Sequence, residues 1–153
     1  MFSNAWAPGK SEWDPTTLRA LTLTRQYRAA YGSDIRNVAQ ARRGIAGFAA
    51  ECGFSEEVIS DIRLAAGEAL SNAVEHGRGK PARRIVVHCF FGEDILKIEI
   101  RDSGSDFPTP HDRDSVEPDD RGRGFGIFLM RRLMDEVSFA RNGKVVRLVR
   151  RRI

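Results

Sequence analysis

The sequence predicts one α+β domain, a two-layer sandwich in which helices cover one face of a largely antiparallel sheet. The period of the apolar residues gives the expected order strand, helix, helix, strand, strand, long loop, helix, strand, strand. Strand pairs joined by short turns outnumber connections through helices, which favours an antiparallel sheet over a doubly wound parallel one. The length of 153 residues suits a single core and makes two domains improbable.

The N-terminal part of the chain lacks a regular pattern. Residues 1–17 contain two prolines and the isolated Trp6 and Trp13. We expect this N-terminal extension to be loosely ordered unless the tryptophans dock somewhere, and we assign residues 18–153 to the folded domain. Leucine and threonine alternate in the stretch 18–27, which predicts the first strand.

Two helices are expected next. Asp34 is a suitable N-cap for the first, whose apolar stripe continues until Gly53 ends it. Ser55 can cap the second, and the acids that follow it suit the positive end of a helix. This second helix should reach about His76, where glycines stop it.

A hairpin and a long loop follow the second helix. The apolar stretches 83–91 and 95–101 predict two strands joined by a turn at 92–94. The stretch 103–121 holds three prolines and many acids, so it cannot form a regular element. Loops of this length in a compact domain are usually lids or binding segments.

The chain is expected to end with a helix and a second hairpin. The stretch 124–133 has helical periodicity. The stretches 136–141 and 145–151 then predict two strands around the Asn-Gly turn at 142–143. No internal repeat is visible.

Composition and charge exclude several classes of protein. The net charge of +4 arises from arginines interleaved with acids, and only residues 150–152 form a basic run, so we expect no direct nucleic-acid binding. No apolar run approaches the length of a membrane span and the start lacks a signal-peptide pattern, which predicts a cytoplasmic protein without membrane contact. Cys52 and Cys89 are too few for a disulfide framework and should be buried, reduced thiols.

Three polar residues of the second helix form the first candidate site. Glu68, Asn72 and His76 are spaced four residues apart, so they lie on one stripe of the helix. This stripe alone is most simply a solvated face. A carboxylate and an amide oxygen one turn apart can also hold a hard cation such as Mg²⁺ or position a water.

The end of the second hairpin strand is the next candidate. Asp102 follows an apolar strand directly and can accept a hydrogen bond from a ligand amino group, while Gly104 permits close approach of the backbone. The same residues in isolation are ordinary turn chemistry.

A glycine-rich stretch at the start of the last helix is the third candidate. Its residues are Arg121, Gly122, Arg123, Gly124 and Gly126, and free backbone amides there would form an anion site at a helix N-terminus. A dinucleotide-binding motif is excluded because a Pro-rich loop, rather than a strand, precedes it. The Gly-Lys-Ser at 9–11 is excluded as a P-loop because no strand precedes it and its first glycine is missing.

In this order, the three candidates resemble the N, G1 and G2 boxes of the GHKL ATPase superfamily. The segments EALSNAVEHG, from Glu68, and GIFLMRRLMDEV, from Gly126, carry the likeness most specifically. Within the superfamily, the chain resembles the anti-sigma-factor serine/threonine kinases of the RsbW type over about residues 18–151. The resemblance implies the Bergerat ATP-binding fold, with a mostly antiparallel mixed sheet.

The resemblance also implies roles for individual residues. Glu68 matches the general base that accepts the proton of the acceptor serine, Asn72 the Mg²⁺ ligand, and His76 a position near the phosphates. Asp102 matches the acceptor of the adenine amino group, with Gly104 beside it. The residues that match the turn around the triphosphate are Gly122, Gly124 and Gly126, and Arg121 or Arg123 can add positive charge there.

Two positions depart from the family pattern. Asp106 stands where relatives often have a second glycine, which predicts a tighter or more acidic floor of the nucleotide site. Lys144 stands where relatives commonly have a threonine that supports adenine through water. We therefore expect ATP affinity to be the property most affected by this chain's own sequence.

The function implied by the resemblance is that of an ATP- and Mg²⁺-dependent protein-serine kinase. Such a protein sequesters a sigma factor and phosphorylates a STAS-domain antagonist, and it is a homodimer. The alternative is a nucleotide-dependent binding module of the same fold that transfers no phosphate. The ATPase domain of a sensor histidine kinase is less favoured, because no dimerising helix pair with an acceptor histidine is visible.

Overall fold

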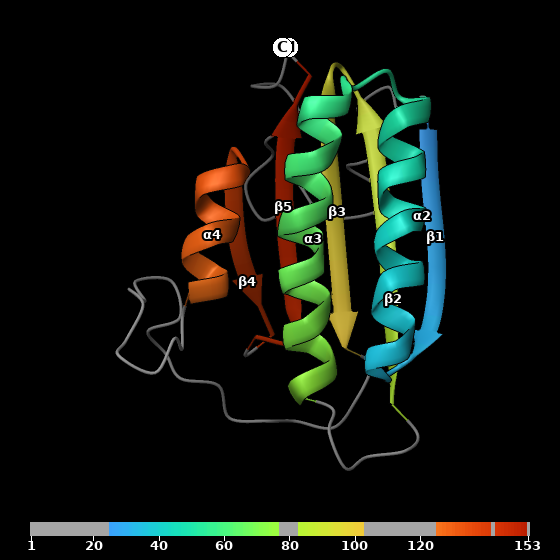
Figure 1. Ribbon diagram of the computed structural model, residues 1–153, viewed down its shortest axis with the longest axis vertical. Helices are drawn as coiled ribbons and strands as arrows, with labels where there is room; N and C mark the ends of the chain where they lie inside the picture. The colour runs from blue at the N-terminus through green and yellow to red at the C-terminus, as the bar shows by residue number, and fades with distance from the viewer. Residues whose placement is uncertain (1–24, 77–82, 103–124, 142, 153) are drawn as a thin grey trace, which may run out of the picture.

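The computed structural model describes residues 25–76, 83–102, 125–141 and 143–152 of the 153-residue chain. These residues form two layers, with three α-helices packed against one face of a five-stranded sheet (Figure 1). The predicted α+β sandwich is therefore confirmed. The strands are β1 (Arg25–Gly32), β2 (Arg84–Gly92), β3 (Ile95–Asp102), β4 (Glu136–Ala140) and β5 (Val145–Arg151). The helices are η2 (Ile35–Asn37), a 3₁₀ turn, and α2 (Val38–Glu51), α3 (Glu56–His76) and α4 (Phe125–Leu133).

The sheet has the strand order β1-β2-β3-β5-β4, and each of its four described pairings is antiparallel. The expectation of a largely antiparallel sheet is confirmed, and no parallel pair occurs among the described strands. Both predicted hairpins form. Glu93 and Asp94 adopt positive φ values of 52° and 63° in the tight turn between β2 and β3, the conformation that matches the twist of a two-residue hairpin.

The first strand differs from its prediction. Strand β1 runs from Arg25 to Gly32, whereas the alternation of leucine and threonine placed it at 18–27. Within β1, Tyr27 and Tyr31 face the helices, and the ring of Tyr27 stacks on Phe48 with centroids 5.8 Å apart. Small and aromatic residues thus continue the strand beyond the predicted end. Residues 18–24 lie outside the described part of the chain.

The helix boundaries follow the predicted caps, with one difference. The Asp34 carboxylate accepts a hydrogen bond from the backbone N of Arg36 at 2.8 Å, but the turn that it caps is η2, and the α-helical geometry of α2 begins only at Val38. Gly53 follows α2 with a φ of +87°, a conformation that favours glycine. Ser55 Oγ accepts from the backbone N of Val58 at 3.3 Å at the start of α3.

The core lies between the helices and the sheet. Its largest fully buried side chains include Ile45, Ile62, Leu70, Ile98 and Leu148, which come from both layers. Cys52 and Cys89 are buried free thiols, as predicted, and burial raises the pKa of each. No described helix is both long and apolar enough to cross a membrane. The N-terminal extension 1–17 and the loop 103–121 lie outside the described residues.

Candidate functional site

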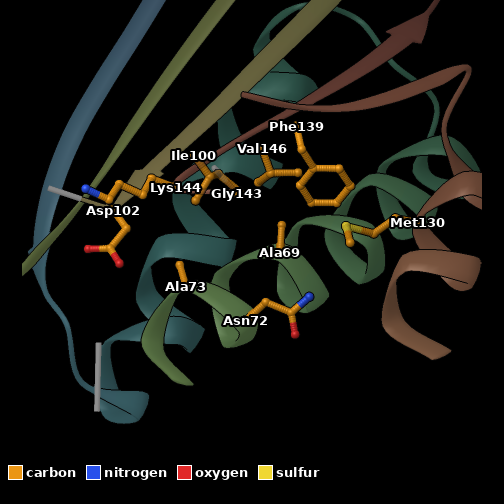
Figure 2. A pocket seen from close by; sticks show the side chains of 10 residues that line it. All are labelled: Ala69, Asn72, Ala73, Ile100, Asp102, Met130, Phe139, Gly143, Lys144 and Val146. Carbon is orange, nitrogen blue, oxygen red and sulfur yellow. The ribbon is translucent and has the colours of Figure 1, made fainter. Parts of the chain in front are cut away.

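The structure brings two of the predicted site residues to one cavity. Asn72 of α3 and Asp102 at the end of β3 both line one cavity between the helical layer and the sheet. Gly143 and Lys144, directly before β5, complete its polar end. In the view of Figure 2, Asp102 and Lys144 lie together at one end of the group, and Asn72 lies on the helix below. The structure thus places these two candidates at the same cavity.

The other walls of the cavity are apolar. Side chains from α3, β3, α4 and the last hairpin form them, namely Ala69, Ala73, Ile100, Met130, Phe139 and Val146. Ile100 and Met130 have almost no exposed surface. A cavity with apolar walls and a carboxylate at one end suits a flat heteroaromatic ring that carries an amino group.

Asp102 is held from two sides. Its backbone N donates to the carbonyl oxygen of Lys144 at 2.8 Å, which ties the end of β3 to the last hairpin. Its side chain is 4% exposed, and Oδ2 accepts from Nη1 of Arg83 at 2.9 Å, a group that is only 3% exposed. A charge pair this well buried fixes the position of the carboxylate, because moving either group would leave the other buried without its partner.

Arg83 was not identified from the sequence. It lies directly before β2, nineteen residues from Asp102, and the antiparallel register places Ile85 opposite Asp102. An arginine before a strand is ordinary, and only the pairing of β2 with β3 brings it to the acid. In the sequence, only the register of the hairpin could have indicated this pair, and that register depends on the turn at Glu93 and Asp94.

Glu68 lies one helical turn before Asn72 on α3, outside the cavity lining but beside the start of α4. Gly126, in the first turn of α4, packs directly against it: a Cβ atom built on Gly126 would lie 2.7 Å from Oε2 of Glu68. The resemblance assigned Gly126 to the turn around the triphosphate. The structure adds that the missing side chain of Gly126 leaves the space in which the Glu68 carboxylate lies.

Several predicted site residues cannot be placed. His76 is the last residue of α3, and its side chain is not described. Outside the described residues lie Gly104, Asp106, Arg121, Gly122, Arg123 and Gly124. Among the residues that are described, no three His, Cys, Asp or Glu side chains gather in a way that could hold a metal ion.

Comparison with known proteins identifies the family. A family model described as a histidine kinase-like ATPase domain matches residues 32–150. The chain belongs to the histidine kinase-like ATPase family. The match spans the chain from the end of β1 to near the end of β5, so the three described α-helices and the cavity lie within this ATPase domain.

The curated relatives are more specific. The chain is 33% identical over 110 residues to a protein of Listeria monocytogenes named serine-protein kinase RsbW, an alignment that covers 66% of this chain and 70% of the relative. Proteins of the same name from Oceanobacillus iheyensis and Bacillus pumilus are 35% and 31% identical, over 66% and 68% of this chain and 70% and 71% of theirs. The resemblance to the RsbW type is thereby confirmed.

Proposed function

We propose that the chain is an ATP-dependent protein-serine kinase that sequesters a sigma factor and phosphorylates a STAS-domain antagonist. The observation that carries the proposal is that Asp102 and Asn72 line one cavity, while Glu68 lies one helical turn before Asn72 and beside Gly126. Relatives named serine-protein kinase RsbW support the same activity.

The cavity is the proposed adenine site. The Asp102 carboxylate accepts the adenine amino group, and the ring lies between the apolar walls from α3 and the sheet. The buried pair with Arg83 uses Oδ2, and a carboxylate has about four lone-pair positions on its two oxygens, so holding Arg83 does not exhaust its capacity as an acceptor. Lys144 beside Asp102 adds a positive charge that relatives with a threonine lack.

Asn72 is the proposed Mg²⁺ ligand. Mg²⁺ is commonly bound through one or two protein oxygens, substrate phosphates and several waters, so an amide oxygen at the cavity rim fits this ion without a dedicated cage. When bound, the ion neutralises charge on the phosphates. His76, at the end of the same helix, and the glycines and arginines of 121–124 are proposed to lie near the phosphates.

Glu68 is the proposed general base. Its carboxylate takes the proton of the acceptor serine as the serine oxygen bonds to the γ-phosphorus, while the bond from that phosphorus to the bridging oxygen breaks and ADP leaves. Positioning and charge neutralisation provide most of the catalysis in phosphoryl transfer, and the base orients the incoming hydroxyl. Glu68 lies one turn from Asn72, so the base and the metal ligand share one helix face.

The proposed setting is a homodimer in the cytoplasm, with a sigma factor and a STAS-domain protein as partners and without direct contact to nucleic acid or membrane. The alternative is a binding module that holds nucleotide and partner without transferring phosphate. Glu68 favours the kinase, because such a module has no use for a carboxylate beside the proposed phosphate site.

Radiolabelled phosphate transfer tests the proposal. The purified chain is incubated with γ-labelled ATP, Mg²⁺ and candidate STAS-domain proteins, with EDTA as the control. We expect label on a serine of one partner, and no label with EDTA. Binding of ATP and of a sigma factor without any transfer to the STAS partners would support the binding module instead.

A further inference from the structure

The sheet has a second face, turned away from the helices. The register places on it the side chains that alternate with the core residues of each strand. In the middle of the three central strands this second face includes Val86, His88, Phe90, Lys97, Glu99, Arg101, Val145, Arg147 and Val149. The described helices α2, α3 and α4 lie on the opposite side of the sheet (Figure 1).

Three apolar residues of the second face are buried. Phe90 is 4% exposed, Val145 0% and Val149 4%, and none of them belongs to the core cluster between the helices and the sheet. Among the described residues, no helix or strand lies over this face. A sheet face in contact with water normally carries polar residues in alternation. Phe90, Val145 and Val149 are therefore as buried as residues in a protein interior, although the described part of the chain has no layer over them.

We propose that the N-terminal segment 1–24 docks on the second face and covers Phe90, Val145 and Val149. The segment joins the sheet at Arg25, the first residue of β1, whose neighbour Gln26 pairs with Phe90. The segment therefore leads directly to one of the three buried residues.

The segment is long enough to cover the others. Val145 and Val149 lie on β5, three strands from β1, a distance of roughly 15 Å at the usual strand spacing. Trp13 precedes Arg25 by twelve positions, and twelve extended residues span up to about 40 Å. Both Trp13 and Trp6 can thus reach the whole second face without strain on the connection.

The chemistry of the segment matches that of the face. It carries both tryptophans of the chain, and large aromatic side chains bury much apolar area. The three buried residues of the face that it would cover, Phe90, Val145 and Val149, are also apolar.

The segment also lies outside the part of the chain that the ATPase family model matches, which begins at residue 32. The other long stretch outside the described residues, 103–124, contains a single Phe, Tyr or Trp, namely Phe107. The N-terminal segment is therefore the better occupant, and it would add a third layer to this domain. Docking of this segment does not depend on kinase activity.

Intrinsic fluorescence tests the docking in the full chain. The variants Trp6→Phe and Trp13→Phe each leave one tryptophan, so each reports on one position. We expect at least one of them to show blue-shifted emission and several-fold weaker acrylamide quenching than the same variant in denaturant. If acrylamide quenches both tryptophans as strongly as in the denatured chain, the proposal is overturned.

A pair of serine variants locates the docked tryptophan. Ser138 is exposed and pairs with Arg147 on the second-face side of β4, whereas Ser60 is exposed on α3 in the helical layer. Each is changed to cysteine and carries a nitroxide, with labelled wild type as the control for the buried Cys52 and Cys89. We expect the Ser138 label to quench the shielded tryptophan and the Ser60 label to leave it unchanged.

The other possible results of the fluorescence and label experiments either support or overturn the docking. Quenching by the Ser60 label alone, or by neither label, would place the tryptophan elsewhere and overturn the proposal. If dilution removes the shielding of the tryptophan and light scattering shows dissociation, a second copy of the chain covers the second face. That result would overturn the intramolecular docking. Shielding that is independent of protein concentration supports it.

Discussion

Replacing Gly126 by alanine should separate catalysis from stability. A Cβ at this position would lie 2.7 Å from Oε2 of Glu68, and ordinary contact begins near 3.4 Å, so the carboxylate must move by about 0.7 Å. Because a misplacement of about 1 Å at a catalytic group can reduce the rate about 10²-fold, we expect phosphotransfer to fall roughly 10- to 100-fold.

The stability of the Gly126→Ala variant should not fall. Gly126 lies within α4 and is not among the residues with positive φ, so alanine fits its backbone. The displaced atom is the end of a flexible side chain, which can rotate at little cost. Alanine is favoured over glycine in helices, so we expect the free energy of unfolding to stay constant or rise by up to about 1 kcal/mol.

Gly47 provides the matched control. It lies in α2, and a Cβ built there meets no atom within 4 Å. Gly47→Ala should keep the wild-type turnover, measured with labelled ATP and a STAS-domain partner, and gain similar stability in urea. Wild-type turnover of Gly126→Ala would refute the positioning of Glu68 by this contact, as would a loss that lies entirely in ATP affinity.

The remaining predictions concern the buried pair and the tyrosines. Asp102→Asn should weaken ATP binding by about 1–3 kcal/mol, or one to two decades, in titration calorimetry, and equal affinities would contradict the adenine assignment. Arg83→Met breaks a pair whose side chains are 3% and 4% exposed and should lower the unfolding free energy by about 3–5 kcal/mol in urea. Arg151→Met, the control in an exposed ion pair, should cost less than about 1 kcal/mol, and equal losses would contradict the role of burial. Burial and a hydrogen bond with Tyr31 raise the pKa of Tyr27 from 10.0 to about 12, so its contribution to stability is complete below pH 10 and is lost as the pH rises towards 12. The phenolate absorbance that Tyr27→Phe removes should therefore appear near pH 12, and its appearance near pH 10 would refute the burial argument.

The sequence predicted the architecture well because each element had its own local signal. Asp34 and Ser55 marked helix starts, Gly53 marked an end, and the alternating apolar residues of 83–91 and 95–101 marked the hairpin that became β2 and β3. The end of the first strand was predicted too early because its inward-facing Tyr27, Ala29 and Tyr31 form a weaker pattern than the leucines that precede them.

The site was predicted in part, for a similar reason. Asn72 and Asp102 were found because each belongs to a short motif, and the cavity joins them. The pair between Arg83 and Asp102, and the contact between Gly126 and Glu68, depend on which elements pack together, which local patterns do not encode. The burial of Phe90, Val145 and Val149 on the second face likewise depends on which parts of the chain pack together.

The substitution Glu68→Gln tests the central claim most directly. Glutamine keeps the size and hydrogen bonding of the side chain but cannot accept the serine proton. In a rapid-quench assay with a STAS-domain partner, we predict that turnover falls roughly 10²- to 10⁴-fold while ATP and sigma-factor affinities stay near wild type. Phosphotransfer by the Gln variant at the wild-type rate would show that Glu68 is not the base and would contradict the account.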